Sequence, residues 1–205
     1  MDIYINKYQD NLIDIVKRIE IISEIINKKF TTNYINTDTE FTCLQFRKII
    51  ESIVFCSLIV NEEEYSNVHE KFSKHYNARL IVADLKRVNP NYFPIPVTQE
   101  VIQNDSGRTF ILKNVEEGFL TENELLNIYE KCGAFLHQEN PFSQKRNYIN
   151  IQEEFPIWLN KTIILLNNHY TTCFGNKFIF HGILKNKDTG LPYVSKFRTE
   201  DVNLK

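Results

Sequence analysis

A lysine and a histidine six positions apart, Lys131 and His137, are the residues whose types and spacing best fit a chemical reaction. They lie in a predicted helical segment, residues 129–141, with the sequence YEKCGAFLHQENP. A histidine can take the proton of a 2′-hydroxyl group near neutral pH, and a fixed cation can stabilise the charge that develops on the phosphate. Six steps along a regular helix leave the two side chains roughly 120° apart. They therefore converge on RNA only if the helix distorts near Gly133 or if the site forms across a dimer.

A cation followed at short spacing by a histidine, in a helical protein, resembles the active motif of the HEPN superfamily. HEPN proteins are all-helical bacterial domains, often dimeric, found in toxin and anti-phage systems, and many of them cleave RNA without metal. The resemblance extends loosely over residues 40–168 and implies that Lys131 and His137 are catalytic. The chain departs from the family motif at two positions. Lys131 replaces an arginine, which removes a bidentate contact, and Cys132 replaces the polar residue that usually follows it.

A second interpretation gives His137 a structural role. It falls in the last predicted turn before Asn140-Pro141, where a protonated imidazole interacts favourably with the helix C-terminus. Gly133, one turn earlier, would allow another helix to approach closely. The helical phase and the lysine favour a non-catalytic helical interaction or ligand-binding protein. The resemblance to HEPN domains implies that it belongs to a bacterial defence or toxin–antitoxin system. The alternative is a HEPN-like, metal-independent ribonuclease.

Four further residues are candidates for binding a ligand. Arg47 and Glu51 are spaced i, i+4 in one helix and can form an ion pair. This helix looks like the internal Arg/Glu helix of some HEPN domains. Arg47 shares an apolar stripe, so it is expected to be partly buried and to need partners, either Glu51 or a bound anion. His75 and Arg79 also share a helix face, and they could hold a phosphate or belong to a solvated surface.

The composition fits one globular domain, with 205 residues, 42% hydrophobic residues and a formal net charge of −2. That charge gives no overall attraction to nucleic acid, so an RNA or protein partner would use a local patch. We expect no metal and no cofactor, because the sequence has no glycine-rich phosphate loop and its four cysteines form no C-x-x-C pair. The longest apolar stretch, residues 49–60, is too short to span a bilayer, and no signal peptide is evident. A cytoplasmic location without a membrane partner is therefore expected.

The first helix is predicted over residues 2–29, where apolar residues recur at alternating steps of three and four. The apolar stripe is wide enough for burial in a helical bundle. It would also allow a homodimer in which the N-terminal helices of two subunits pair. Further helices are predicted over residues 40–60, 62–88, 121–138 and 153–168.

Local patterns predict where three of these helices begin. One of residues 37–39, Thr-Asp-Thr, can cap the second helix. Thr121, followed three residues later by Glu124, has the spacing of a capping box. Pro156 fits the first turn of the last helix.

The pattern of the final segment, residues 169–205, changes to a period of two, which predicts a β-meander with a turn at Gly175-Asn176. Its strands are expected at residues 170–174, 177–184 and 193–198. His169 and His181 are expected to be exposed. Residues 89–120 are rich in proline and predicted as an irregular insertion, with a short strand at residues 108–113.

The expected fold is therefore mainly α, a bundle of about five helices with a C-terminal three-stranded antiparallel β-meander (α+β). The bundle covers residues 1–168 and includes the irregular insertion at about 89–120. The meander, residues 169–205, is expected to pack on the same domain.

Overall fold

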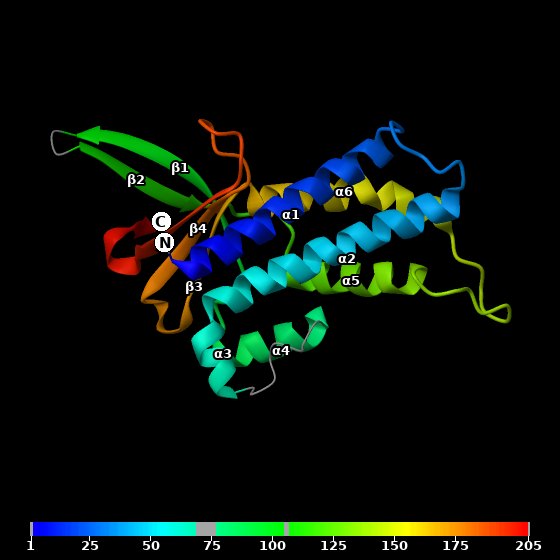
Figure 1. Ribbon diagram of the computed structural model, residues 1–205, viewed down its shortest axis with the longest axis horizontal. Helices are drawn as coiled ribbons and strands as arrows, with labels where there is room; N and C mark the ends of the chain where they lie inside the picture. Colours follow the sequence, from blue (N-terminus) through cyan, green and yellow to red (C-terminus); the bar gives the residue numbers. More distant parts are fainter. Residues whose placement is uncertain (1, 69–76, 105–106, 205) are drawn as a thin grey trace.

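The computed structural model describes residues 2–68, 77–104 and 107–204. These residues form an α+β fold, in which long helices run beside one another and a β-sheet lies toward one end of the molecule (Figure 1). The bundle predicted from the sequence is present. Its helices are α1 (Ile3–Ile26), α2 (Ile35–Val60), α3 (Glu62–Val68), α4 (Ala78–Val88), α5 (Glu122–Phe135) and α6 (Tyr148–Asn167).

α2 is the central helix, because it packs against α1, α4, α5 and α6. Its core contact is aromatic: the Phe46 ring lies 5.6 Å from the ring of Phe155 and 5.4 Å from that of Trp158, both on α6. Aromatic side chains remove large apolar areas from water, so such a cluster contributes strongly to core stability. The central position predicted for this helix is confirmed.

The start of α2 differs from the prediction. α2 begins at Ile35, five residues earlier than expected, so the predicted cap within residues 37–39 is wrong. Asp38 instead binds the turn that precedes the helix. Its carboxylate accepts hydrogen bonds from the Thr31 hydroxyl at 2.6 Å, and from the Thr32 amide and hydroxyl at 2.7 and 2.8 Å.

The capping box predicted for α5 is confirmed. The Thr121 hydroxyl accepts a hydrogen bond from the Glu124 amide at 3.3 Å, and the Glu124 carboxylate accepts one from the Thr121 amide at 3.0 Å. α6 begins at Tyr148, with Asn147 as its N-cap, again five residues earlier than predicted. Pro156 therefore lies inside the helix, where it has no N–H for the carbonyl four residues earlier, and the prediction that it marks the first turn is wrong.

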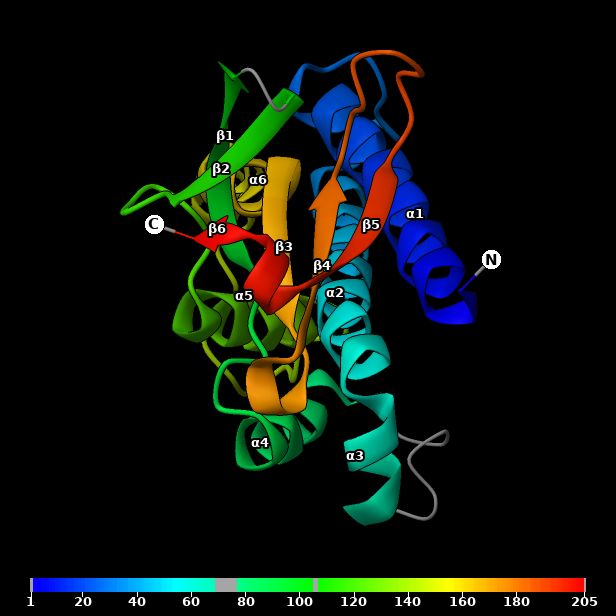
Figure 2. The same cartoon turned by 90° about the vertical axis from the view of Figure 1, so that its left-hand side faces the viewer.

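Within the described residues, the sheet has six strands in the order β5-β4-β3-β1-β2-β6 (Figure 2). Neighbouring strands are antiparallel, except β2 and β6, which are parallel. The predicted meander is present as β3-β4-β5, but the sheet is larger than three strands. Its strands are β1 (Ile95–Asn104), β2 (Gly107–Asn114), β3 (Asn168–Thr172), β4 (Phe178–Ile183), β5 (Tyr193–Arg198) and β6 (Asn203–Leu204).

The segment predicted as an irregular insertion supplies two of these strands. β1 joins β3 only through its first two residues, and it then pairs with β2 as far as Asn104 opposite Gly107. The strand predicted at residues 108–113 lies within β2. β1 was not predicted from the sequence, because its residues 98–104, TQEVIQN, include few apolar residues that would mark one face of a strand.

Two histidines of the sheet are buried, so the expectation that His169 and His181 are exposed is wrong. The Nδ1 atom of His169 lies 2.9 Å from the Leu166 carbonyl oxygen, and its Nε2 atom lies 2.9 Å from the Tyr8 hydroxyl of α1. Nδ1 therefore donates to the carbonyl, and Nε2 accepts from Tyr8. The Tyr8 hydroxyl is also 2.9 Å from that of Thr171. This buried hydrogen-bond network joins α1 to the sheet.

Candidate functional site

Lys131, one of the two predicted catalytic residues, lies on α5 with its side chain against α6. Its ammonium nitrogen is 2.7 Å from the Glu154 carboxylate and 5.7 Å from the centre of the Trp158 ring. Both side chains of the ion pair are about 40% exposed (42% and 39%), so water weakens the attraction. The cation is nevertheless already occupied by a carboxylate.

His137 lies beyond the end of α5, because the helix ends at Phe135 and not near residue 138 as predicted. Its backbone carbonyl accepts a hydrogen bond from Nη1 of Arg146 at 2.5 Å. His137 lines a cavity of about 290 Å³ together with Glu40 of α2, and Lys131 is not among the residues lining it. The structure thus places the two residues in different surroundings, and their catalytic role stays a prediction.

The predicted Arg47–Glu51 ion pair is present, with 3.9 Å between nitrogen and oxygen, within a larger contact between α2 and α5. Nη1 of Arg47 donates to the Tyr129 carbonyl at 3.0 Å, and the guanidinium carbon lies 3.7 Å from the centre of the Tyr129 ring. The Tyr129 hydroxyl donates to Glu51 at 3.3 Å. These partners offset the partial burial of the arginine charge, as the structural interpretation of Arg47 requires.

The helix predicted over residues 62–88 is present as α3 and α4, and residues 69–76 lie outside the described residues. His75 falls among them, so only one member of the proposed phosphate-binding pair can be placed. Arg79 lies in the first turn of α4 and forms an exposed ion pair with Glu130 of α5. Phosphate binding by His75 and Arg79 stays a prediction.

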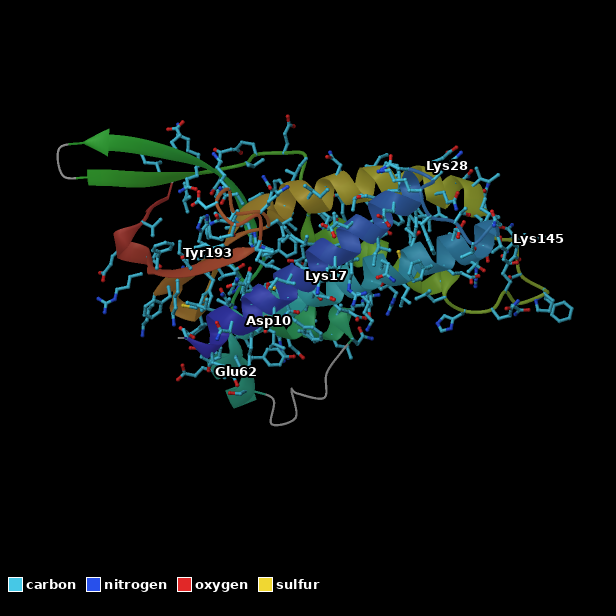
Figure 3. The ribbon with its side chains drawn as sticks, turned by 45° about the horizontal axis from the view of Figure 1, so that its top comes forward. Asp10, Lys17, Lys28, Glu62, Lys145 and Tyr193 are labelled. Atoms are coloured by element: carbon cyan, nitrogen blue, oxygen red, sulfur yellow. The ribbon has the colours of Figure 1, made fainter. Side chains whose placement is uncertain are left out.

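The α1–α2 and α5–α6 connections lie at the end of the bundle farthest from the sheet (Figure 1). Exposed apolar side chains that were not predicted as a site from the sequence lie in and beside these connections. Lys28 and Lys145, one from each connection, mark this end in Figure 3. The sequence feature that could have indicated this region is the presence of aromatic residues within polar loops. Phe142, for example, is 96% exposed. We call this region the bundle-end surface, and its large exposed apolar side chains are Phe30, Tyr34, Ile35, Leu136, Phe142 and Ile149.

Two cavities lie at the bundle-end surface, and Tyr34 lines both. One is the 290 Å³ cavity that contains His137. The other, which we call the α1–α2 cavity, measures about 380 Å³ and lies between the α1–α2 turn and α6. Small-ligand sites typically enclose roughly 300–1,000 Å³. The α1–α2 cavity is lined by the apolar residues Ile25, Ile26, Phe30, Tyr34, Ile35, Phe155 and Pro156, and by the polar residues Lys28, Thr31, Asn33, Asp38 and Gln152.

The turn that forms one wall of this cavity depends on two residues in left-handed backbone conformations, Lys28 with φ 57° and Asn33 with φ 62°. The hydrogen bonds from Thr31 and Thr32 to Asp38 hold the turn against α2. Burial alone would raise the pKa of Asp38, but these hydrogen bonds lower it below its usual value. Asp38 is therefore ionised at neutral pH, and its oxygens are already engaged.

Within residues 2–68, 77–104 and 107–204, no three His, Cys, Asp or Glu side chains are grouped so that they could hold a metal ion. In the same part of the chain, no helix combines the length and apolar character needed to cross a membrane. Comparisons with protein-family models, with curated proteins and with solved structures found no match. The function is therefore inferred from the geometry of this chain.

Proposed function

We propose that this protein is a non-catalytic helical ligand-binding protein, whose binding site is the bundle-end surface with Tyr34 at its centre. The supporting observation is the concentration of exposed apolar side chains around two cavities that share Tyr34. Exposed apolar side chains that gather in one region often mark a binding site.

The surroundings of Lys131 and His137 support a function without catalysis. General acid–base chemistry requires the participating groups to reach one reacting centre. Glu154 of α6 pairs with Lys131, whereas His137 lines a cavity that Lys131 does not line. The described contacts therefore give the cation and the histidine different partners, which favours a function that does not use them together.

A thermal-shift screen of small anionic, neutral and cationic compounds with apolar bodies tests the proposal on wild type, Tyr34→Ala and Tyr193→Ala. Tyr193 is a matched control, because it is also an exposed tyrosine (47% against 58%) but lies on β5, away from the bundle end (Figure 3). A ligand that binds the folded state raises Tm. We expect the screen to find compounds that raise the Tm of wild type and of Tyr193→Ala but do not raise the Tm of Tyr34→Ala. Stabilisation that is unchanged in Tyr34→Ala would place the site elsewhere.

A HEPN-like ribonuclease is the second candidate function, and the position of His137 in a surface cavity is the observation that favours it. RNA degradation by purified wild type and His137→Ala, with EDTA present, separates the two functions. Cleavage that persists in EDTA and disappears in His137→Ala would establish the ribonuclease and overturn the non-catalytic proposal. Absence of cleavage by both proteins supports the binding function.

A second possible partner is another copy of the same chain, in a homodimer formed through α1. The exposed side of α1 carries charged residues such as Asp10 and Lys17 (Figure 3), which a pairing of two copies through this side would bring into the interface. Light scattering over a range of concentrations, with wild type and Lys17→Glu, tests this arrangement. A dimer that Lys17→Glu does not weaken would exclude α1 as its interface. The apolar seam of α1 is already buried within the chain at Tyr8, Leu12, Ile15 and Ile22.

A further inference from the structure

We infer that the α1–α2 cavity binds a small amphipathic carboxylate, with its hydrocarbon body against the apolar walls and its anionic head beside the Lys28 ammonium. This inference rests on the proposed function, because it assigns a ligand class to one of the two cavities of the bundle-end surface. It is carried by the lining of the cavity, by its size and by the charges at its rim.

The walls of the cavity favour an apolar body. Aliphatic side chains of α1 and the aromatic rings of Phe30, Tyr34 and Phe155 face the same space. Apolar surface that a ligand covers is removed from water, which favours binding. The volume of about 380 Å³ lies at the lower end of small-ligand sites, so it suits a single compact molecule better than a polymer.

Lys28 determines the sign of the charge that the cavity favours. It is exposed and lines the cavity, and no ion-pair partner for it is found among the described residues. The turn itself does not require a lysine here, because its φ of 57° is adopted more easily by glycine or asparagine.

The other charges at the rim are compensated. The carboxylate of Asp38 is engaged by Thr31 and Thr32. α1 ends and α2 begins at this rim, so the opposite partial charges of the two helix ends offset each other. Lys28 is thus the residue of the lining whose charge has no partner among the described residues, and this charge favours a carboxylate over a neutral or cationic head.

Ligand binding in this cavity can be followed by the fluorescence of a tryptophan of the chain. Trp158 is the single tryptophan of the sequence, and its ring lies 5.6 Å from the ring of Phe155, which lines the cavity. The 205-residue chain is titrated below micellar concentrations with decanoate, decanol and decyltrimethylammonium. Binding is followed by tryptophan fluorescence and by calorimetry.

The variants are Lys28→Gln, Lys28→Arg and Lys29→Gln. Lys29 is a matched control, because it is the adjacent exposed lysine and does not line the cavity. We expect decanoate to bind wild type, Lys28→Arg and Lys29→Gln alike. Lys28→Gln should bind it roughly twofold to fivefold more weakly, as for the loss of one solvent-accessible ion pair. Circular dichroism checks that each variant is folded, and the Lys28→Arg rescue separates loss of charge from damage to the turn.

Several results would overturn the inference. The first is that decanoate binds wild type and Lys28→Gln with equal affinity. The second is that wild type binds decanol as tightly as decanoate. The third is that wild type binds anionic phospholipid vesicles but does not bind decanoate. If decanol or the ammonium compound binds at least as tightly as decanoate and Tyr34→Ala abolishes its binding, the carboxylate assignment fails while the proposed function stands. If no compound binds in a manner that depends on Tyr34, both fail.

Discussion

Arg47 of α2 lies directly against the backbone of Gly133 of α5, so that a Cβ atom at position 133 would stand 2.7 Å from Nη1 of the arginine. On its other sides the guanidinium is held by the carbonyl and ring of Tyr129 and by the carboxylate of Glu51. The glycine costs the helix about 1 kcal/mol relative to alanine. In return, it leaves room for an arginine that joins the two helices.

Replacing Gly133 with alanine should therefore destabilise the protein, although alanine is the better helix former. The added methyl group displaces the guanidinium from its partners, and hydrogen bonds to charged groups contribute about 1.5–3 kcal/mol. After the gain in helix propensity, we expect a net loss of about 1 kcal/mol in the free energy of unfolding. Urea denaturation of wild type and Gly133→Ala measures it.

A double-mutant cycle with Arg47→Met provides the control. In that background the alanine meets a shorter, uncharged side chain, so Gly133→Ala should stabilise the protein by about 0.5–1 kcal/mol. A destabilisation of equal size in both backgrounds would show that the arginine contact does not explain the glycine.

The buried His169 should make the protein sensitive to mild acid. Burial lowers the pKa of His169 to about 4, against 6.5 for the exposed group. The unfolded chain therefore takes up a proton below pH 6.5, whereas the folded protein takes it up only near pH 4. The stabilisation is fully present above pH 6.5 and is lost as the pH falls to 4, by roughly 3 kcal/mol. Unfolding free energies measured from pH 7.5 to pH 4 test this.

His169→Gln separates this effect from other titrations, because glutamine can accept from Tyr8 and donate to the Leu166 carbonyl without titrating. The variant should show a shallower loss of stability between pH 6.5 and 4. His181 contributes in the same direction, since burial also lowers its pKa, so some slope should remain. An unchanged slope in His169→Gln would exclude His169 as its source.

Features set by neighbouring residues could be predicted from the sequence. The capping box of Thr121 and Glu124 needs only a spacing of three residues. The turn at Gly175-Asn176 needs two residues that tolerate positive φ, and they have φ of 71° and 53°. The Arg47–Glu51 pair likewise follows from one turn of helix.

Features set by distant partners could not be predicted. The polar run before α2 resembles a loop, and only the folded turn shows that Asp38 binds Thr31 and Thr32 from inside the helix. Alternation placed His169 just before the first predicted strand and His181 within the second, but which face of the sheet α1 covers depends on the tertiary fold. The bundle-end surface is formed by segments more than 100 residues apart, such as those of Tyr34 and Tyr148, which line one cavity.

Asp38→Ala should loosen the α1–α2 turn. The substitution removes a charged acceptor of three hydrogen bonds from Thr31 and Thr32, and the expected loss of unfolding free energy is about 2–3 kcal/mol. Asp10→Ala is the control, because Asp10 is an exposed acid on α1, and it should change stability by less than about 0.5 kcal/mol. Denaturation curves of the two variants make the comparison. Similar losses in both would show that Asp38 does not hold the turn.

Thiol labelling should distinguish Cys173 from the other three cysteines. Cys43, Cys56 and Cys132 are buried, whereas Cys173 is partly exposed. Burial raises the pKa of Cys56, and interaction with the Cys43 thiol together with burial raises that of Cys132.

The thiolate is the reactive form of cysteine, so these buried thiols should react only on unfolding. Mass spectrometry after brief treatment with iodoacetamide should find one label per native chain, at Cys173, and four labels in urea. Cys173→Ser should remove the rapid label. A second rapid label on Cys43 or Cys132 would mean that α2 and α5 separate in the native protein, since both thiols are fully covered when these helices are packed together.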